Sequence, residues 1–337
     1  MTIKKLTVIA VAGAALLAGA IGISMSLTTP HEMEMEVSEK PAKQEGEETG
    51  AKTLGDMENT PLYYDETKKL LLPLRNVMEG LGGSVKWNTE TKKTEVTYRG
   101  RTLALAAGEA QATLNGYEVT LPAAAEMING CLYVDETLVS AYYTSQVDFD
   151  VETGQVTLQA KDSTEPVMAV CLLTGEKDGQ TYEIEAPVIV GLNDSKYEKN
   201  LNESLRQELQ DYGDSFLQED AAASGELRLE ANAGICTKAF LSLYWEGLRD
   251  GAKVTFAKNY DLQEQKNVTL AELLDASVMG KVQEAAGERW TEDSFFLMEN
   301  GGIILYVDDG EGETHTLGID FETPQWKGSY KELFRKK

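Results

Sequence analysis

Two clusters of acidic residues have the types and spacing that could bind a hard cation. The run Asp308–Glu313 places four carboxylates around two glycines, and Ca²⁺ prefers carboxylate oxygens as ligands. Its spacing is not that of an EF-hand loop, and acidic, glycine-rich turns of this kind are usually solvated. In the second cluster, Asp148, Asp150 and Glu152 alternate with apolar residues over 147–151. This alternation predicts the solvent face of a strand, so we assign no metal-binding residue.

The sequence contains no motif for nucleophilic or metal-assisted catalysis. Gly-x-Ser-x-Gly, His-Glu-x-x-His and a phosphate-binding loop are all missing from it, and His31 and His315 are its two histidines. Pairs of Asp and Glu hydrolyse glycosides when they face each other across a cleft, which spacing along the chain cannot show. We therefore assign no catalytic or cofactor-binding residue and expect no cofactor.

The chain is strongly acidic. Its 337 residues include 56 Asp and Glu against 31 Lys and Arg, which gives a formal net charge of −25. Such a protein repels phosphate backbones and anionic lipid headgroups, so nucleic acid is excluded as a partner. Cys131, Cys171 and Cys236 are widely separated, whereas exported domains stabilised by disulfides have even, closely spaced sets. We expect no disulfide.

Residues 1–30 have the layout of an export segment. Lys4 and Lys5 precede Leu6–Leu27, which contains no charged residue, as in an n-region followed by an h-region. Two interpretations stay open. The segment is either a signal peptide cleaved after 18–20 or a signal anchor, because about 20 apolar residues span a bilayer. Only five residues precede the hydrophobic run, so we expect no cytoplasmic domain and no binding of a sigma factor.

Residues 31–60 differ in composition from the rest of the exported chain. They are rich in Glu, Lys, Gly and Thr and almost free of aliphatic side chains. Such a segment buries too little apolar surface to offset the entropy of ordering it. We predict an acidic, disordered spacer over 31–60.

Residues 61–161 predict short strands and turns in a duplicated arrangement. Leu70–Gly83 predicts a strand and then a short helix that begins near Pro73. Hairpins are predicted over 84–98 and 113–121, the second with a type I′ turn at 115–116. The strand–helix–hairpin pattern recurs over 131–158, which indicates an internal duplication. The matched residues, at a constant offset of 62, are Val85, Trp87, Asn88, Glu90 and Thr91 with Val147, Phe149, Asp150, Glu152 and Thr153.

This unit (LLLPLRNVMEGLGGSVKWNTETKKTEVTY, a strand carrying LNG, then CLYVDETLV and VDFDVETGQVTL) resembles the copper amine oxidase N-terminal-like stalk domain over residues 61–160. In that family the second copy usually repeats Val-Pro-Leu-Arg, whereas Tyr133–Glu136 occupies the position here. The resemblance implies a small antiparallel sheet against a helix, a spacer or adhesive role, and no catalysis of its own.

The tripeptide Asn259–Asp261 matches the one in which copper amine oxidases form a quinone from tyrosine. That chemistry needs three histidines to hold the copper ion, and this chain has two histidines in total. Tyr260 also falls on an apolar face with Val254 and Phe256. We therefore predict that Tyr260 packs in the core.

Residues 162–337 predict a second, α+β unit. An amphipathic helix is expected from Asp194 to about Phe216, and a capping box at Thr269–Glu272 opens another helix. Strands are expected from alternating apolar residues over 186–190, Ile235–Trp245, Val254–Leu262, 295–298, 303–307 and 317–321.

Three stretches, NYDLQEQKNVTLAELL, FFLMENGGIILYV and SYKELF, resemble the extracytoplasmic domain of lysozyme-sensing anti-sigma factors. The same domain precedes some exported polysaccharide deacetylases, and the resemblance covers residues 165–335. The family commonly has Gly-Gly-Ala-His before the Asn-Tyr-Asp stretch, where this chain has Asp250–Lys253. A ligand contact through that histidine is therefore not implied.

We expect an α+β protein with an N-terminal export or anchor helix, a small antiparallel β-rich unit and a second unit with an antiparallel sheet against helices. The expected function is non-catalytic: an exported cell-envelope protein, secreted or held to the membrane by its N-terminal segment alone. Its expected partner is a basic envelope protein such as lysozyme, or a cell-wall glycan. Two alternatives are a carboxylate-dependent glycan or peptidoglycan hydrolase and a purely structural spacer. Acidity also promotes solubility by itself.

Overall fold

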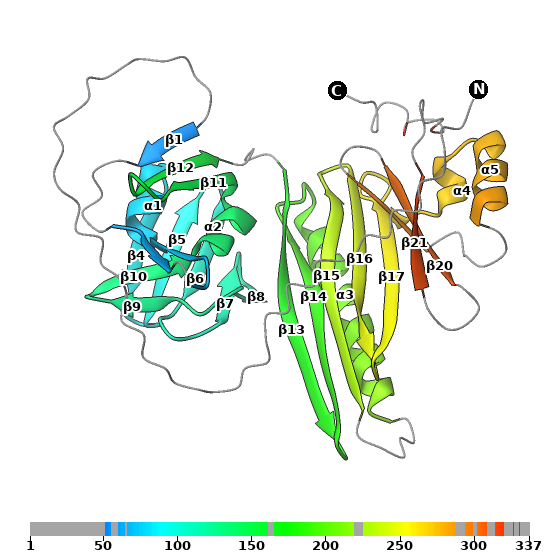
Figure 1. Cartoon of the computed structure of the whole chain (residues 1–337), viewed down its shortest axis with the longest axis horizontal. Coiled ribbons are helices and arrows are strands. Elements are labelled where there is room, and N and C mark those ends of the chain that lie inside the picture. Colours follow the sequence, from blue (N-terminus) through cyan, green and yellow to red (C-terminus); the bar gives the residue numbers. More distant parts are fainter. Residues whose placement is uncertain are drawn as a thin grey trace. The chain divides into compact units, whose positions relative to one another are not determined.

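The computed structural model describes residues 51–54, 60–64, 66–160, 165–218, 225–286, 294–298, 302–308, 314–319, 326 and 330. These residues form two compact units that divide between residues 163 and 164, the N-terminal unit and the C-terminal unit (Figure 1). The expected export segment 1–30 lies outside the described residues. Within the described part of the chain, no helix is long and apolar enough to cross a membrane.

The N-terminal unit is built from short strands and two short helices. Its strands form three sheets with the orders β1-β12-β11, β2-β3-β10-β9 and β4-β5-β6-β7-β8. The elements are β1 (Ala51–Leu54), β2 (Leu62–Tyr64), β3 (Lys69–Pro73), α1 (Leu74–Gly80), β4 (Ser84–Asn88), β5 (Lys93–Tyr98), β6 (Arg101–Leu105), β7 (Gln111–Leu114), β8 (Tyr117–Thr120), β9 (Glu126–Ile128), β10 (Cys131–Asp135), α2 (Glu136–Tyr142), β11 (Thr144–Asp150) and β12 (Gln155–Ala160).

The predicted duplication is confirmed element by element. The series β3–α1–β4–β5 is repeated as β10–α2–β11–β12, with both helices and the last strands offset by 62 residues. The hairpin turns repeat as well. Asn88 Oδ1 accepts the backbone N–H of Glu90 at 3.0 Å, and Asp150 Oδ1 accepts that of Glu152 at 2.9 Å.

The two copies pair with each other through their first strands. β3 and β10 run antiparallel with Leu72 opposite Val134, and these two residues hold equivalent positions in the two copies. A local twofold axis therefore relates the copies at this pair. The apolar faces of α1 and α2 are buried at Val77, Met78 and Leu138, which forms the core of the unit.

Residues 51–54 correct the prediction of a spacer that extends to residue 60. They form β1, which pairs antiparallel with β12 from Ala51 opposite Gln159 to Leu54 opposite Val156. The sequence did not reveal this strand, because four residues are too few to show the alternation of apolar and polar residues that identifies a strand.

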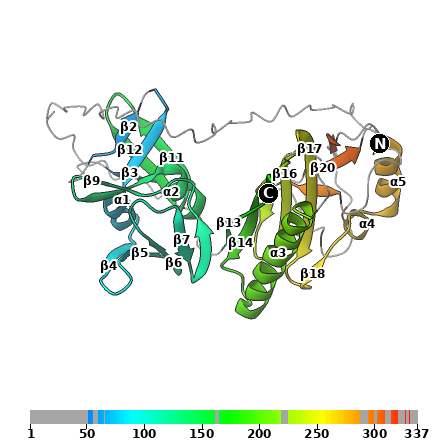
Figure 2. The same ribbon diagram turned by 90° about the horizontal axis from the view of Figure 1, so that it is seen from below.

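The C-terminal unit contains a six-stranded sheet with the order β13-β14-β15-β16-β17-β18 and a three-stranded sheet with the order β19-β20-β21. The long helix α3 lies along one face of the larger sheet (Figure 2). The elements are β13 (Val167–Lys177), β14 (Gln180–Val190), α3 (Ser195–Phe216), β15 (Glu226–Cys236), β16 (Phe240–Arg249), β17 (Ala252–Asp261), β18 (Lys266–Asn267), α4 (Leu270–Leu273), α5 (Ala276–Ala286), β19 (Phe295–Leu297), β20 (Ile303–Asp308) and β21 (Thr314–Ile319).

The larger sheet is not wholly antiparallel as predicted, because β14 and β15 run parallel. Helix α3 lies between these two strands in the sequence, and a parallel pair needs such a crossover because both strands begin at the same end of the sheet. The predicted strand over Ile235–Trp245 is also divided. Thr237 donates from its backbone N–H to the carbonyl of Phe240 at 3.0 Å, which closes a turn between β15 and β16.

Helix α3 buries the predicted apolar stripe, including Leu201, Leu205, Leu209 and Phe216. Near its C-terminal end, the ring of Tyr182 on β14 lies between the backbones of Gly175 and Gly213. A Cβ atom at residue 213 would lie 2.9 Å from that ring, and one at residue 175 would lie 2.3 Å from it. Both glycines are needed for the helix and the sheet to enclose the ring.

Near its N-terminal end, α3 replaces a missing strand. The pairing of β14 with β15 ends at Ile184 and Leu229, and beyond this point side chains of α3 bind the free edge of β14. Asn202 accepts the N–H of Ile189 at 2.8 Å and donates to its carbonyl at 2.9 Å. Glu198 accepts the N–H groups of residues 191 and 192 at 2.7 and 2.8 Å. Both side chains are therefore buried with their polar groups satisfied.

A second core joins the smaller sheet, α4 and α5 to the end of the larger sheet. Its buried side chains include Phe240, Leu270, Leu273, Phe295 and Leu305. The predicted capping box is confirmed, since the Glu272 carboxylate accepts the backbone N–H of Thr269 at 2.9 Å. The predicted hairpin is confirmed by β19 and β20.

Candidate protein-binding face

The larger sheet of the C-terminal unit has one face against α3 and a second face that is partly open. On β15, Leu227, Leu229 and Ala231 are buried toward α3, while Glu226 and the residues that alternate with them are exposed. Strand pairing places charged residues of β13, β14, β16 and β17 on the same side. We call this surface the open face and define it by Glu176, Glu183, Glu185, Glu226, Arg228, Glu230, Glu246 and Lys253.

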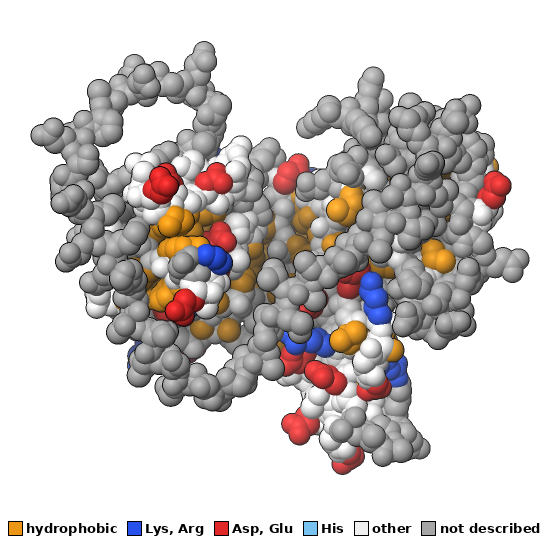
Figure 3. Space-filling model, viewed as in Figure 1, with side chains coloured by type: hydrophobic (Ala, Val, Ile, Leu, Met, Phe, Trp, Pro, Cys, Tyr) orange, Lys and Arg blue, Asp and Glu red, His pale blue; other side chains and the backbone are white. Residues whose placement is uncertain are grey.

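The open face carries six glutamates and two cations. Acidic and basic side chains gather over the lower part of β13–β17 (Figure 3). Arg228 Nε lies 4.0 Å from carboxylate oxygens of both Glu183 and Glu230, and Lys253 Nζ lies 3.9 Å from Glu246. These pairs are about half exposed, so each stabilises the fold weakly. The face keeps an excess of negative charge.

Glu185 lies where β14 and β15 separate. Its carboxylate accepts the backbone N–H of Ala231 at 2.9 Å, and its carbonyl accepts the indole N–H of Trp245 at 3.0 Å. Burial raises the pKa of Glu185, the neighbouring Glu230 raises it further, and the hydrogen bond from Ala231 opposes the shift. This carboxylate therefore closes the gap in the sheet.

Glu246 lies next to an aromatic group at the boundary with the smaller sheet. The rings of Tyr244 and Phe296 stack with centroids 4.0 Å apart, and Phe296 also contacts the ring of Tyr306. Tyr306 is buried, and burial followed by the nearby Glu246 carboxylate raises the pKa of its hydroxyl well above the ordinary value. The packed rings fix this end of the open face.

The tripeptide Asn259–Asp261 has a structural role. Asn259 donates to the carbonyl of Phe295 at 2.7 Å and so joins β17 to β19. Tyr260 is buried, which confirms the packing interpretation, and burial raises the pKa of its hydroxyl above the ordinary value. Asp261 accepts a hydrogen bond from Tyr330 at 2.8 Å. All three side chains stabilise the core.

The acidic clusters identified in the sequence do not come together with other ligands in the described residues. Asp148 and Asp150 are exposed, and hydrogen bonds from Thr153 and then from Glu152 lower the pKa of Asp150. This confirms the predicted solvent face of a strand. Residues 309–313 and His31 lie outside the described residues, and His315 lies on β21 opposite Val307. In the described part of the chain, no group of three His, Cys, Asp or Glu is arranged to hold a metal ion.

Two further groups of residues from the sequence are placed by the structure. Lys253, which stands where the resembling family commonly has histidine, lies on the open face beside Glu246. Of the cysteines, Cys171 is buried, and Cys131 and Cys236 are half-buried.

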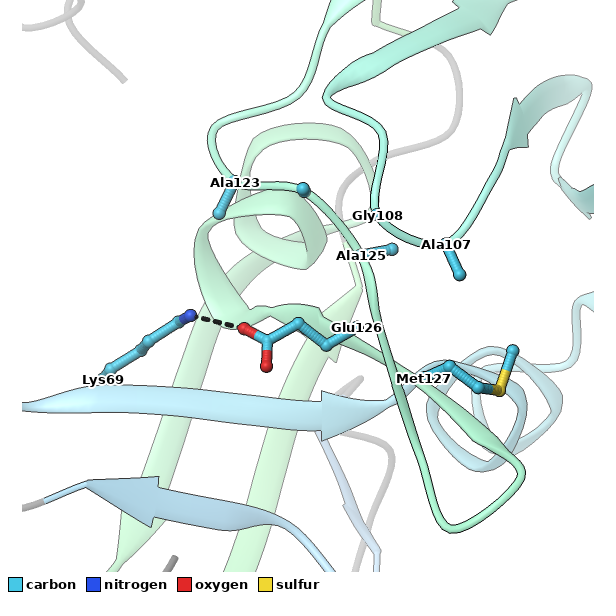
Figure 4. A pocket seen from close by; sticks show the side chains of 8 residues that line it. Lys69, Ala107, Gly108, Ala123, Ala125, Glu126 and Met127 are labelled. Carbon is cyan, nitrogen blue, oxygen red and sulfur yellow. Dashed lines mark hydrogen bonds and ion pairs between the residues drawn. The ribbon is translucent and has the colours of Figure 1, made fainter. Parts of the chain in front are cut away.

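The N-terminal unit has a shallow groove that the sequence did not reveal (Figure 4). Its volume is about 700 Å³, and it is lined mainly by small side chains over Ala123–Ala125 and 107–108. Lys69 and Glu126 form an ion pair at 2.7 Å on one side of it, and Met127 is 55% exposed. The run of three alanines was the one signal in the sequence, and such a run is equally typical of a helix.

Comparisons with known proteins give a family match for part of the chain. Residues 50–158 match the family described as copper amine oxidase N-terminal domain. The N-terminal unit therefore contains such a domain, which confirms the resemblance seen in the sequence.

A curated relative, named "Protease inhibitor", comes from Brevibacillus choshinensis. It is 25% identical over 201 residues, which cover 55% of this chain and 61% of the relative. The chain thus spans less than two thirds of that protein.

Two solved structures of DUF3298 family proteins are similar at a low level. The one from Bacteroides fragilis NCTC 9343 is 12% identical with a TM-score of 0.36 and covers 50% of this chain and 97% of its own. The one from Pseudomonas aeruginosa PAO1 is 13% identical with a TM-score of 0.32 and covers 47% of this chain and 91% of its own.

Proposed function

We propose that this is a non-catalytic, exported cell-envelope protein whose N-terminal unit is a stalk and whose open face binds a basic protein. The observation that carries the proposal is the excess of glutamates on one side of a regular sheet. An N-terminal signal peptide or signal anchor accounts for export in this proposal.

The physics of the open face favours a cationic protein. Its charges lie on paired strands that are already ordered, so binding has little backbone entropy to overcome. An acidic surface attracts a basic partner at long range and speeds encounter, and salt screens this attraction over a Debye length of about 8 Å. An open, charged sheet surface also suits a protein partner better than a small ligand, which prefers an enclosed apolar pocket.

Two similarities support a protein as the partner. One relative is named a protease inhibitor, and an inhibitor of that kind acts on another protein. The C-terminal sequence also resembles that of anti-sigma factors that sense lysozyme, which is a cationic protein. Because Lys253 stands in place of the histidine, we expect a basic partner whose contact at this position differs from that of lysozyme.

The test measures association of the exported chain with immobilised hen lysozyme, used as a cationic probe, at low and high salt. The acidic homologue α-lactalbumin is the control probe. We expect binding to lysozyme that weakens steeply with salt and no binding to α-lactalbumin. Failure to bind lysozyme at low salt, or binding that is indifferent to salt, would refute the proposal.

A matched pair of variants separates the open face from net charge. Glu176, Glu183 and Glu230 are changed together to Gln on the open face. Glu90, Glu109 and Glu152, all exposed on the N-terminal unit, are changed to Gln as the control of equal net charge. We expect association to slow by about tenfold in the first variant and much less in the control. Equal slowing in both would show that overall charge, and not this face, attracts the probe.

A further inference from the structure

The two copies of the duplicated unit in the N-terminal unit differ in what covers the outer edge of their hairpins. In the first copy, β5 pairs with β6. In the second copy, β12 pairs with β1. Because β5 and β12 are equivalent strands, β1 and β6 occupy the same structural position.

The registers of the two pairs correspond residue by residue. Thr94 is opposite Leu105 in the first copy, and Val156, the equivalent of Thr94, is opposite Leu54 in the second. Both pairs are antiparallel. The outer edge of β12 is therefore a complete acceptor site for a strand, built by duplication and not by chance contact.

The strands that fill the two sites are attached differently. β6 follows β5 through a two-residue turn, Arg99-Gly100, with φ angles of 48° and 79°, so it cannot leave its own hairpin. After β12 the chain continues into the C-terminal unit, which leaves no local strand for this edge. The site is filled from far away in the sequence, by residues 51–54.

β1 is separated by five residues from the next described part of the chain. The next residue with a described contact is Thr60, whose carbonyl accepts a hydrogen bond from Tyr133 at 3.0 Å. The sequence between them is Gly-Asp-Met-Glu-Asn, at 55–59. All four residue pairs of β1 with β12 are the same whether β1 comes from the same copy or from another one. An unfilled edge would expose backbone donors and acceptors that pair readily with another chain.

We propose that the outer edge of β12 is a strand-acceptor site and that residues 51–54 of a second copy of this chain occupy it reciprocally. The product is a strand-exchanged dimer, joined through the stalk and independent of any ligand of the open face. Exchange of an identical element is a route to dimers that needs few new contacts. Copies held side by side on a membrane would favour it through their high effective concentration.

The experiment is disulfide trapping between two different variants. Cys131, Cys171 and Cys236 are first changed to Ser, Ala and Ser. Thr53→Cys is then introduced into one preparation of the exported chain and Thr157→Cys into another, because Thr53 lies directly opposite Thr157. Antiparallel pairs have Cα separations of about 4.5–5.5 Å, within the range that disulfides span.

The two preparations are mixed at high concentration, oxidised, and separated without reductant. We expect a disulfide-linked heterodimer in this mixture. A mixture of Glu95→Cys and Ala104→Cys chains, which tests the equivalent pair of the first copy, is expected to give none, since β6 is tethered to β5.

A chain that carries both Thr53→Cys and Thr157→Cys shows whether β1 is docked on β12. If this chain closes its own disulfide but the mixture of single variants gives no heterodimer, exchange does not occur and the proposal is wrong. If neither disulfide forms, β12 does not accept residues 51–54 and the proposal is also wrong. A heterodimer in the control mixture would show non-specific oxidation and overturn the assignment to β12.

Discussion

The replacement of a strand by helix side chains predicts a large effect of one buried asparagine. Asn202 makes two hydrogen bonds to the backbone of Ile189, at 2.8 and 2.9 Å, and Ile189 is 0% exposed. Asn202→Ala leaves a backbone N–H and a carbonyl unpaired where water does not reach. Each unsatisfied group costs about 1–3 kcal/mol, so the loss of both should lower the unfolding free energy of the C-terminal unit by about 2–6 kcal/mol.

The assay is urea unfolding of the chain without residues 1–30, followed by circular dichroism and by tryptophan fluorescence. With a slope of about 2 kcal/mol per molar urea, the midpoint of the C-terminal unit should drop by about 1–3 M. Asn200→Ala is the matched control, since Asn200 is exposed on the same helix and alanine slightly favours the helix. Midpoints of Asn202→Ala and Asn200→Ala that agree within error would refute the reasoning.

Three more predictions follow from the structure. Burial raises the pKa of Glu185, so the folded protein holds this proton more tightly than the unfolded chain. Stability therefore falls as the pH rises from about 4.3 through the raised pKa. In urea unfolding, Glu185→Gln should be more stable than the parent at pH 7 and equally stable near pH 4, and an equal difference at both pH values would contradict this. Asn88→Ala and Asp150→Ala remove equivalent turn hydrogen bonds, and in thermal unfolding each should destabilise the N-terminal unit by about 1 kcal/mol. If only one of the two variants is destabilised, the two turns are not equivalent. Limited proteolysis should cut near residues 161–165, between the two compact units, and mass spectrometry that finds one resistant fragment across this point would show a single fused unit.

The sequence predicted the local elements of the N-terminal unit well, because their signals are local. The turn at Asn115-Gly116 needs positive φ at both residues and has 49° and 89°, and asparagine and glycine adopt such angles most easily. The duplication was visible because the same turn chemistry recurs at Asn88 and Asp150. Such features depend on a few neighbouring residues, so they can be recognised without the fold.

The features that the sequence did not reveal depend on distant parts of the chain. The parallel pair of β14 and β15 depends on how α3 crosses the sheet, and Glu198 and Asn202 look like solvated helix residues until the edge of β14 is placed beside them. β1 pairs with a strand more than a hundred residues away. The open face itself was missed, because its glutamates come from four strands and no single stretch of sequence contains the group.

The position of Tyr182 between two glycines has a consequence for how this unit varies in evolution. A side chain at residue 175 or 213 would overlap the ring, so neither glycine can change while the aromatic residue remains. A smaller residue at 182 would release both glycines at once, and alanine would then stabilise α3 at residue 213. Residues 175, 182 and 213 should therefore covary in relatives of this unit, and a side chain at residue 175 or 213 should be found only where the aromatic ring at residue 182 has already been lost.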